Sequence, residues 1–194
     1  PKVGVYVGSS WNEYPLFGGH DINDPAPPVA TNACNIANRV SYWFNFKGSS
    51  LTLDTACSSS LTALHVACAT LRSGENDLAL VGGVNLSLHP NKFRALSQGQ
   101  FLSTKGLCES FGEGADGYVP SEAVAAVLLK PKARAIADGD HIYGVIRASA
   151  LLHGGKTNGY SVPDPVQQAA VIREALAQAG VTPSEMSYIE AHGT

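Results

Sequence analysis

The sequence contains little charge, and none of it is concentrated in one segment. Only 15% of the 194 residues are charged, the formal net charge is −3, and no basic cluster is present. Nucleic acids and acidic membrane surfaces are bound by basic patches, so nothing in the charge pattern indicates either as a partner. No apolar run is long enough to span a bilayer, and no segment resembles a signal peptide.

The sequence also has few cysteines, no internal repeat and no low-complexity segment. Its four cysteines are irregularly spaced, which fits neither a disulfide framework nor a metal site and is typical of reduced cytosolic thiols. With 44% hydrophobic residues, the chain can bury a sizeable core. We therefore expect a soluble, globular protein of the cytoplasm.

Strand and helix patterns alternate along the chain, which predicts the α/β class. Strands are expected at residues 3–7, 51–54, 77–84, 124–129, 142–152 and 187–190, and helices at 35–44, 57–72, 131–138 and 165–179. Loops are expected at residues 10–28 and 103–122. A loop as long as the second is usually functional.

A change of period marks Cys57 as the most informative position in the sequence. Residues 51–54 alternate apolar and polar side chains, as a strand does, and the residues after Cys57 have helical spacing. Free N–H groups and the positive dipole end at a helix start stabilise an anion, so the position favours a nucleophilic thiolate. The same N–H groups are able to bind an oxyanion. We expect the three serines after Cys57 to cap the first turn.

The alternative for Cys57 is a buried structural role, because free cysteine packs like a small hydrophobe. Physical context alone leaves both roles open. For Cys34, Cys68 and Cys108 we expect the buried structural role, since nothing around them favours a thiolate or matches metal-ligand spacing.

His192 is the second candidate site residue. It lies beside a glycine at the end of a predicted strand, where α/β folds place ligand-binding loops. An imidazole there can donate a hydrogen bond or transfer a proton near neutral pH, although a lone histidine is more often structural. A site role is less expected for the other histidines, which are His20, His65, His89, His141 and His153.

Two ordered motifs resemble those of one family. The run DTACSSSL at residues 54–61 and the run EAHGT at 190–194 closely resemble the β-ketoacyl synthase (ketosynthase) domain of modular polyketide synthases. The resemblance extends through IANRVSY at 36–42, LALVGGVN at 78–85, FGEGADGY at 111–118 and DGDHIY at 138–143. The run HGGKTNGYSVP at 153–163, together with FGEG at 111–114, looks most like ketosynthases from assembly lines whose acyltransferase acts in trans.

The resemblance implies a thiolase-like fold with α-β-α-β-α layers, made of two pseudo-equivalent halves. It also implies that the full domain forms a homodimer through a strand near the cysteine. It also implies that Cys57 takes an acyl chain from the phosphopantetheine arm of an acyl carrier protein. Decarboxylative Claisen condensation with a malonyl-type extender on a second carrier protein would follow. His192 is then one of two histidines that stabilise the enolate. No metal or bound cofactor is implied for the domain itself.

The resemblance further implies that residues 1–194 are one partial ketosynthase domain, truncated at both ends and without a second domain. The second histidine is expected beyond Thr194, so we expect the isolated chain to be inactive. Some positions differ from the family pattern: residues 121–125 read SEAVA instead of a glycine-rich run, Leu152 replaces a usual asparagine, and Ser49 replaces a usual proline. Cys57 and His192 are unaffected.

Three functions remain open at this point. The chain belongs to an elongating ketosynthase, to a non-elongating ketosynthase that only transfers acyl chains, or to a non-catalytic partner subunit. The presence of Cys57 disfavours the third, since partner subunits usually replace this cysteine. A chain-initiating ketosynthase or a thiolase fits the motif at residues 190–194 less well.

Overall fold

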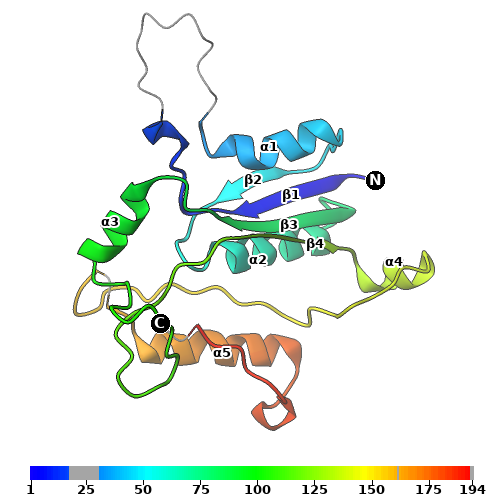
Figure 1. The fold of residues 1–194 in the computed structure, drawn as a ribbon. Coiled ribbons are helices and arrows are strands. Elements are labelled where there is room, and N and C mark those ends of the chain that lie inside the picture. Colours follow the sequence, from blue (N-terminus) through cyan, green and yellow to red (C-terminus); the bar gives the residue numbers. More distant parts are fainter. Residues whose placement is uncertain (18–30, 161, 193–194) are drawn as a thin grey trace, which may run out of the picture. The chain divides into compact units, whose positions relative to one another are not determined.

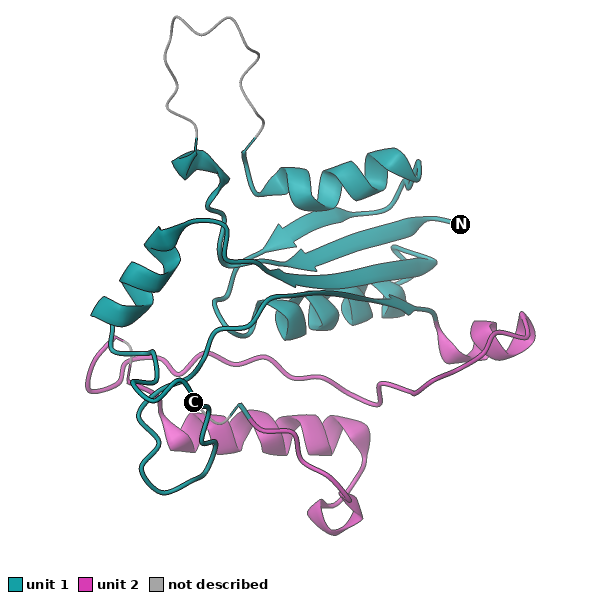
Figure 2. Cartoon of the chain, in the orientation of Figure 1, with its two compact units in different colours: residues 1–130, 192–194 teal, residues 131–191 magenta. Residues whose placement is uncertain are grey.

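A computed structural model describes residues 1–17, 31–160 and 162–192 (Figure 1). The chain forms two compact units (Figure 2). Unit 1 contains residues 1–130 together with 192–194, and unit 2 contains residues 131–191. Most of the loop expected at residues 10–28 and His20 lie outside the described residues.

Unit 1 is built on a four-stranded sheet in the order β2-β1-β3-β4. The strands are β1 (Val3–Gly8), β2 (Ser50–Leu53), β3 (Leu78–Asn85) and β4 (Ala123–Leu129). The first three strands are parallel, and β4 runs antiparallel to β3. Its described α-helices are α1 (Cys34–Trp43), α2 (Ser59–Arg72) and α3 (Pro90–Gln98), and a short 3-10 helix lies at Tyr14–Leu16 within the expected loop. Figure 1 shows α1 and α2 on opposite faces of the sheet.

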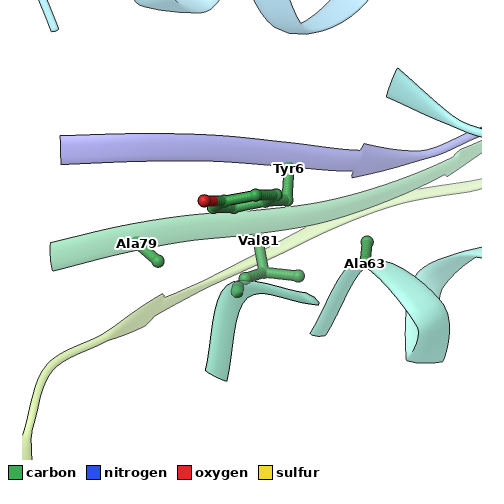
Figure 3. Packing of buried hydrophobic residues seen from close by; sticks show 5 residues of the cluster. Tyr6, Ala63, Ala79 and Val81 are labelled. Carbon is green, nitrogen blue, oxygen red and sulfur yellow. The ribbon is translucent and has the colours of Figure 1, made fainter. Parts of the chain in front are cut away.

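The larger core cluster lies between the sheet and α2 (Figure 3). Tyr6 from β1 packs there with alanines of α2 and β3 and with Val81. Small side chains let α2 approach the sheet closely, and the Tyr6 ring fills the space that remains. The buried Tyr6 hydroxyl lies 2.8 Å from both Thr70 Oγ1 and Asn76 Nδ2, so its polar group is satisfied. A smaller cluster of Val5, Val7 and Ala37 joins the other face to α1.

Unit 2 contains two helices, α4 (Lys132–Ala137) and α5 (Pro165–Ala179), and a short 3-10 helix at Pro183–Glu185. The predicted start of α5 is confirmed, since the Asp164 carboxylate accepts a hydrogen bond of 2.8 Å from the Val166 N–H. Helix α5 ends at Gly180, whose φ of 63° is a left-handed conformation that glycine adopts without strain.

The sequence correctly places the four strands of unit 1, but the strands predicted at 142–152 and 187–190 are wrong. Among the described residues of unit 2 there is no strand, and both segments are irregular. A strand exists only where a second strand satisfies its N–H and C=O groups. Ile142, Val145 and Ile146 remain exposed in the first segment.

Two buried charges join the segment after β1 to α3. Glu13 is 4% exposed and Lys92 is 1% exposed. The Glu13 carboxylate accepts hydrogen bonds of 3.0–3.1 Å from the N–H groups of Leu88, His89 and Lys92 at the start of α3. The Lys92 ammonium donates to Asn85 Oδ1 at 2.7 Å and lies over the Trp11 ring. Burial lowers the pKa of Lys92, and the Glu13 and Glu122 carboxylates partly offset this.

The Glu13→Gln variant is expected to lose about 1–3 kcal/mol of unfolding free energy. An amide has one acceptor oxygen where the carboxylate has two, so backbone donors of α3 lose a partner and Lys92 loses a nearby negative charge. Urea denaturation of the full-length protein that contains residues 1–194 checks this. Glu174→Gln is the matched control, since Glu174 is exposed on α5. Equal midpoints for the two variants would contradict the assigned role of Glu13.

Candidate active site

A tight turn at residues 54–58 joins β2 to α2. The Ala56 N–H donates to the Asp54 carboxylate at 2.9 Å, and Ala56 has a φ of 54°. This left-handed conformation is rare for a residue with a Cβ and makes the turn sharp. Helix α2 begins at Ser59, so Cys57 lies just before the helix, as predicted.

The serines after Cys57 brace this turn instead of capping the helix. Ser58 is the N-cap residue but makes no side-chain capping bond. Its hydroxyl donates to the Thr55 carbonyl at 2.8 Å, and the Ser59 hydroxyl donates to the Ala56 carbonyl at 2.6 Å. The Thr55 N–H donates to Ser59 Oγ at 2.9 Å. The prediction that these serines cap α2 is therefore wrong, because the hydroxyls of Ser58 and Ser59 donate to backbone carbonyls of the preceding turn and not to the start of the helix.

Glycines at the ends of two strands let the start of α2 approach the sheet. A Cβ on Gly8 of β1 would lie 2.5 Å from the Ser60 backbone nitrogen, and one on Gly83 of β3 would lie 3.1 Å from Ser60 Cβ. Gly8 therefore leaves no room for a side chain. The sequence indicated a close backbone approach at the β3 glycines, but it gave no sign of the one at Gly8.

The Cys57 side chain is exposed. Within the described ranges, no residue accepts a hydrogen bond from the Cys57 N–H. A thiol and a free N–H thus stand together at the positive end of α2. This arrangement suits a nucleophile that attacks a carbonyl and an N–H that binds the resulting oxyanion.

The other cysteines differ from expectation. Cys34 and Cys108 are exposed and only Cys68 is half-buried, so the buried role predicted for Cys34 and Cys108 is wrong. Burial raises the pKa of Cys68, and Arg72 partly offsets the rise. Exposure alone therefore does not single out Cys57. Its place in a strained turn at a helix start does.

Tyr118 interacts electrostatically with Cys57 and was not singled out from the sequence. Its N–H donates to the Phe101 carbonyl at 2.9 Å, and its carbonyl accepts from the Ser103 N–H at 3.0 Å. These bonds close the loop between residues 103 and 118. Burial raises the pKa of the half-buried Tyr118, and an electrostatic interaction with Cys57 raises it further.

The long loop before Tyr118, at residues 103–117, is stabilised by hydrogen bonds between its own residues. The Asp116 carboxylate accepts hydrogen bonds from the Ser103 hydroxyl at 2.9 Å and from the Thr104 N–H and hydroxyl. Bonds from Thr104 and Ser103 lower the pKa of Asp116. The Lys105 ammonium forms an ion pair with the Glu109 carboxylate at 2.9 Å and donates a hydrogen bond to the Gly114 carbonyl at 2.8 Å. Hydrogen bonds and an ion pair within the loop therefore hold it in a defined conformation.

His192 belongs to the same compact unit as Cys57, although it is far away in sequence. Its side chain is exposed. Other described histidines have local roles: His89 accepts from the Asn91 N–H at the start of α3, and His153 accepts from the Gly155 N–H. His153 also lines a hollow of about 280 Å³ within unit 2.

Within residues 1–17, 31–160 and 162–192, no group of three or more His, Cys, Asp or Glu side chains is placed to hold a metal ion. No helix in these ranges is both long and apolar enough to cross a membrane.

Two family models match the sequence. Residues 1–135 match the model described as "Beta-ketoacyl synthase, N-terminal domain", and residues 143–194 match "Beta-ketoacyl synthase, C-terminal domain". The chain is 58% identical over 194 residues to Polyketide synthase PksL of Bacillus subtilis and 56% identical over 194 residues to Polyketide synthase ThaG of Burkholderia thailandensis. These alignments cover 100% of the chain but 4% and 3% of the relatives.

Solved ketosynthases have the same fold. The oxazolomycin ketosynthase domain OzmH KS7 of Streptomyces albus superposes with a TM-score of 0.95 at 49% identity. The ketosynthase from module 6 of the bacillaene synthase of Bacillus subtilis gives 0.89 at 40% identity. Both matches cover 100% of this chain and 33% of the solved one. The predicted thiolase-like α/β class is confirmed.

Proposed function

The chain belongs to the β-ketoacyl synthase family, and from this premise we propose that it condenses acyl chains in polyketide synthesis, with Cys57 as the acyl acceptor. The observation that supports this most strongly is the turn at residues 54–58. It exposes a thiol beside an unpartnered N–H at the start of α2. The acyl chain would arrive on the phosphopantetheine of an acyl carrier protein.

In the first step, the Cys57 thiolate attacks the thioester carbonyl carbon. The π electrons of the carbonyl move to its oxygen, and the Cys57 N–H is placed to donate a hydrogen bond to that oxyanion. When the oxyanion collapses, the phosphopantetheine thiolate leaves and takes a proton. The acyl chain is then a thioester of Cys57. Covalent capture splits a difficult condensation into two easier steps.

In the second step, a malonyl-type thioester on a carrier protein loses carbon dioxide and becomes an enolate. The enolate carbon attacks the Cys57 thioester and releases the thiolate, which gives the β-ketoacyl product. His192 is proposed to donate a hydrogen bond to the enolate oxygen in the transition state. The family's second histidine would supply another donor.

A non-elongating ketosynthase is the second candidate, because Cys57 serves acyl transfer in both. The run at residues 153–163 further supports an assembly line with a trans-acting acyltransferase. A non-catalytic partner subunit has no use for an exposed thiol in this turn.

One experiment separates these functions. The full-length ketosynthase that contains residues 1–194 is incubated first with an acyl-loaded carrier protein and then with a malonyl-loaded one. An elongating enzyme gives the Cys57 adduct and then a β-ketoacyl product two carbons longer. An adduct without that product indicates transfer only and would overturn the proposed condensation. Absence of both would indicate a partner subunit.

The isolated 194-residue polypeptide is not expected to condense. The chain spans about a third of the length of the solved ketosynthases. Apolar side chains of a strand are usually covered by protein, but Val124 and Leu128 of β4 are 72% and 64% exposed. Activity and stability are therefore measured on the full-length ketosynthase.

We also propose that the full domain forms a homodimer through β2. This strand is at the edge of the sheet. The carbonyls of Ser49 and Leu53 accept hydrogen bonds from the β1 side. Since backbone groups alternate sides along a strand, the N–H of Thr52 points outward and is available to a second copy.

Thr52→Pro is expected to convert the dimer to a monomer, because proline has no N–H to donate. Thr52→Val loses the same hydroxyl but keeps the N–H, so it should remain dimeric. Light scattering during size-exclusion chromatography gives the two masses. A dimeric proline variant would exclude this edge as the interface.

A further inference from the structure

Ser10 reaches the Cys57 turn from a distant part of the sequence. It lies just after β1, and its hydroxyl donates to the Ala56 carbonyl at 2.9 Å across 46 positions of sequence. Ser10 Oγ also lies 3.1 Å from Ser59 Oγ. No other described residue outside positions 54–62 forms a side-chain hydrogen bond to the turn at residues 54–58.

The segment that contains Ser10 is held on both sides. The N–H of the buried Ser9 donates to the Leu53 carbonyl at 3.0 Å, at the end of β2. Three residues after Ser10, the buried Glu13 carboxylate binds the start of α3. Because both flanks are fixed, the Ser10 hydroxyl has a defined position against the turn.

The Ala56 carbonyl is the acceptor where these bonds meet. It accepts from the Ser59 N–H at 3.1 Å, the Ser59 hydroxyl at 2.6 Å and the Ser10 hydroxyl at 2.9 Å. The peptide bond that follows is trans, so the carbonyl of Ala56 and the N–H of Cys57 point in opposite directions in one plane. Whatever fixes the carbonyl therefore also fixes the direction of the Cys57 N–H.

We propose that Ser10 is a positioning residue for acyl transfer: it orients the Ala56–Cys57 peptide so that the Cys57 N–H meets the thioester oxyanion. The inference rests on the proposed function, in which the Cys57 thiolate forms that oxyanion. Ala56 is in a strained left-handed conformation, and a strained turn persists only where its surroundings hold it. The Ser10 hydroxyl contributes a contact that the turn itself cannot supply.

Two reagents separate this role from a general structural one. Acylation by a thioester passes through an oxyanion. Alkylation by iodoacetamide displaces iodide in one step and forms no oxyanion, so it reports only the exposure and charge of the thiol. Both rates are measured at Cys57 of the full-length ketosynthase by peptide mass spectrometry, over a range of pH and of carrier-protein concentration.

Ser10→Ala is expected to slow saturating acylation by about threefold to tenfold, the effect of one hydrogen bond. The half-saturating carrier concentration, the iodoacetamide rate and its pH midpoint should stay unchanged. Ser10→Thr keeps the hydroxyl on Cβ and should restore the rate. Ser73→Ala is the matched control, because the Ser73 hydroxyl donates to the Thr70 carbonyl at the other end of α2. It should acylate at the wild-type rate.

The outcomes distinguish the two proposals. If the wild-type protein forms no adduct at Cys57, the proposed function fails. If the wild type is acylated and Ser10→Ala is acylated at the same rate, only the role of Ser10 fails. Equal slowing of acylation and alkylation would also overturn that role, since it would mean that the turn as a whole had moved.

Discussion

Replacing His192 by alanine is expected to abolish condensation while acyl transfer to Cys57 continues. A histidine that stabilises the enolate acts only after the acyl chain is on the cysteine, so the two steps should respond differently. Removal of such a donor typically costs about 100-fold to 10,000-fold in rate. The measurement follows the Cys57 adduct and the β-ketoacyl product in one reaction of the full-length ketosynthase.

His141→Ala is the matched control for this variant. The His141 ring is exposed and contacts Tyr143 with ring centroids 4.4 Å apart. It should leave both steps unchanged. Wild-type product formation by His192→Ala would contradict the enolate role. Loss of the adduct as well as the product would show that His192 serves acyl transfer instead.

The Gly8→Ala variant is expected to disrupt the active-site turn, because the new methyl group on β1 would clash with the first turn of α2. The new Cβ would lie 2.5 Å from Ser60 N and 2.6 Å from Ser59 C, and backbone atoms cannot rotate away. Either β1 or the first turn of α2 must shift. We expect a loss of about 1–3 kcal/mol in unfolding free energy. Acylation of the folded protein should fall by about tenfold or more, since small displacements in an active site are costly.

Two other glycines provide graded controls for Gly8. Gly83→Ala meets only the Ser60 side chain, at 3.1 Å, and should be milder. Gly144→Ala meets nothing within 4 Å and should be neutral. Urea denaturation and the acylation rate give this order. If Gly8→Ala were as stable and as active as Gly144→Ala, the close approach of α2 to β1 would not position Cys57.

The sequence predicts the strands of unit 1 better than those of unit 2, because a strand forms only where another strand lies beside it. The segments that became β1 to β4 find partners within the described chain, so their apolar patterns translate directly into strands. Residues 142–152 have an equally apolar pattern but no strand beside them, and they stay irregular. Helix α5 needs no partner for its backbone, and its start and end at Asp164 and Gly180 were predicted from local signals.

The site was predictable only where its chemistry is local. The change from strand to helix spacing located Cys57, because both patterns lie beside it in sequence. Ser10 and Gly8 lie against the start of α2 because the topology of the sheet places the end of β1 there, and no single-sequence pattern reveals such contacts. The role of His192 stays a prediction.

The most direct test of the account is the site of acylation. The full-length ketosynthase is incubated with an acyl-loaded carrier protein, and the intact mass and peptide masses are measured for the wild type and for Cys57→Ala. If Cys57 is the acyl acceptor, the wild type carries one acyl group on Cys57 and the variant carries none. Peptide mapping is needed because Cys34 and Cys108 are also exposed. An adduct that persists in Cys57→Ala, or that maps to another cysteine, would contradict Cys57 as the acyl acceptor.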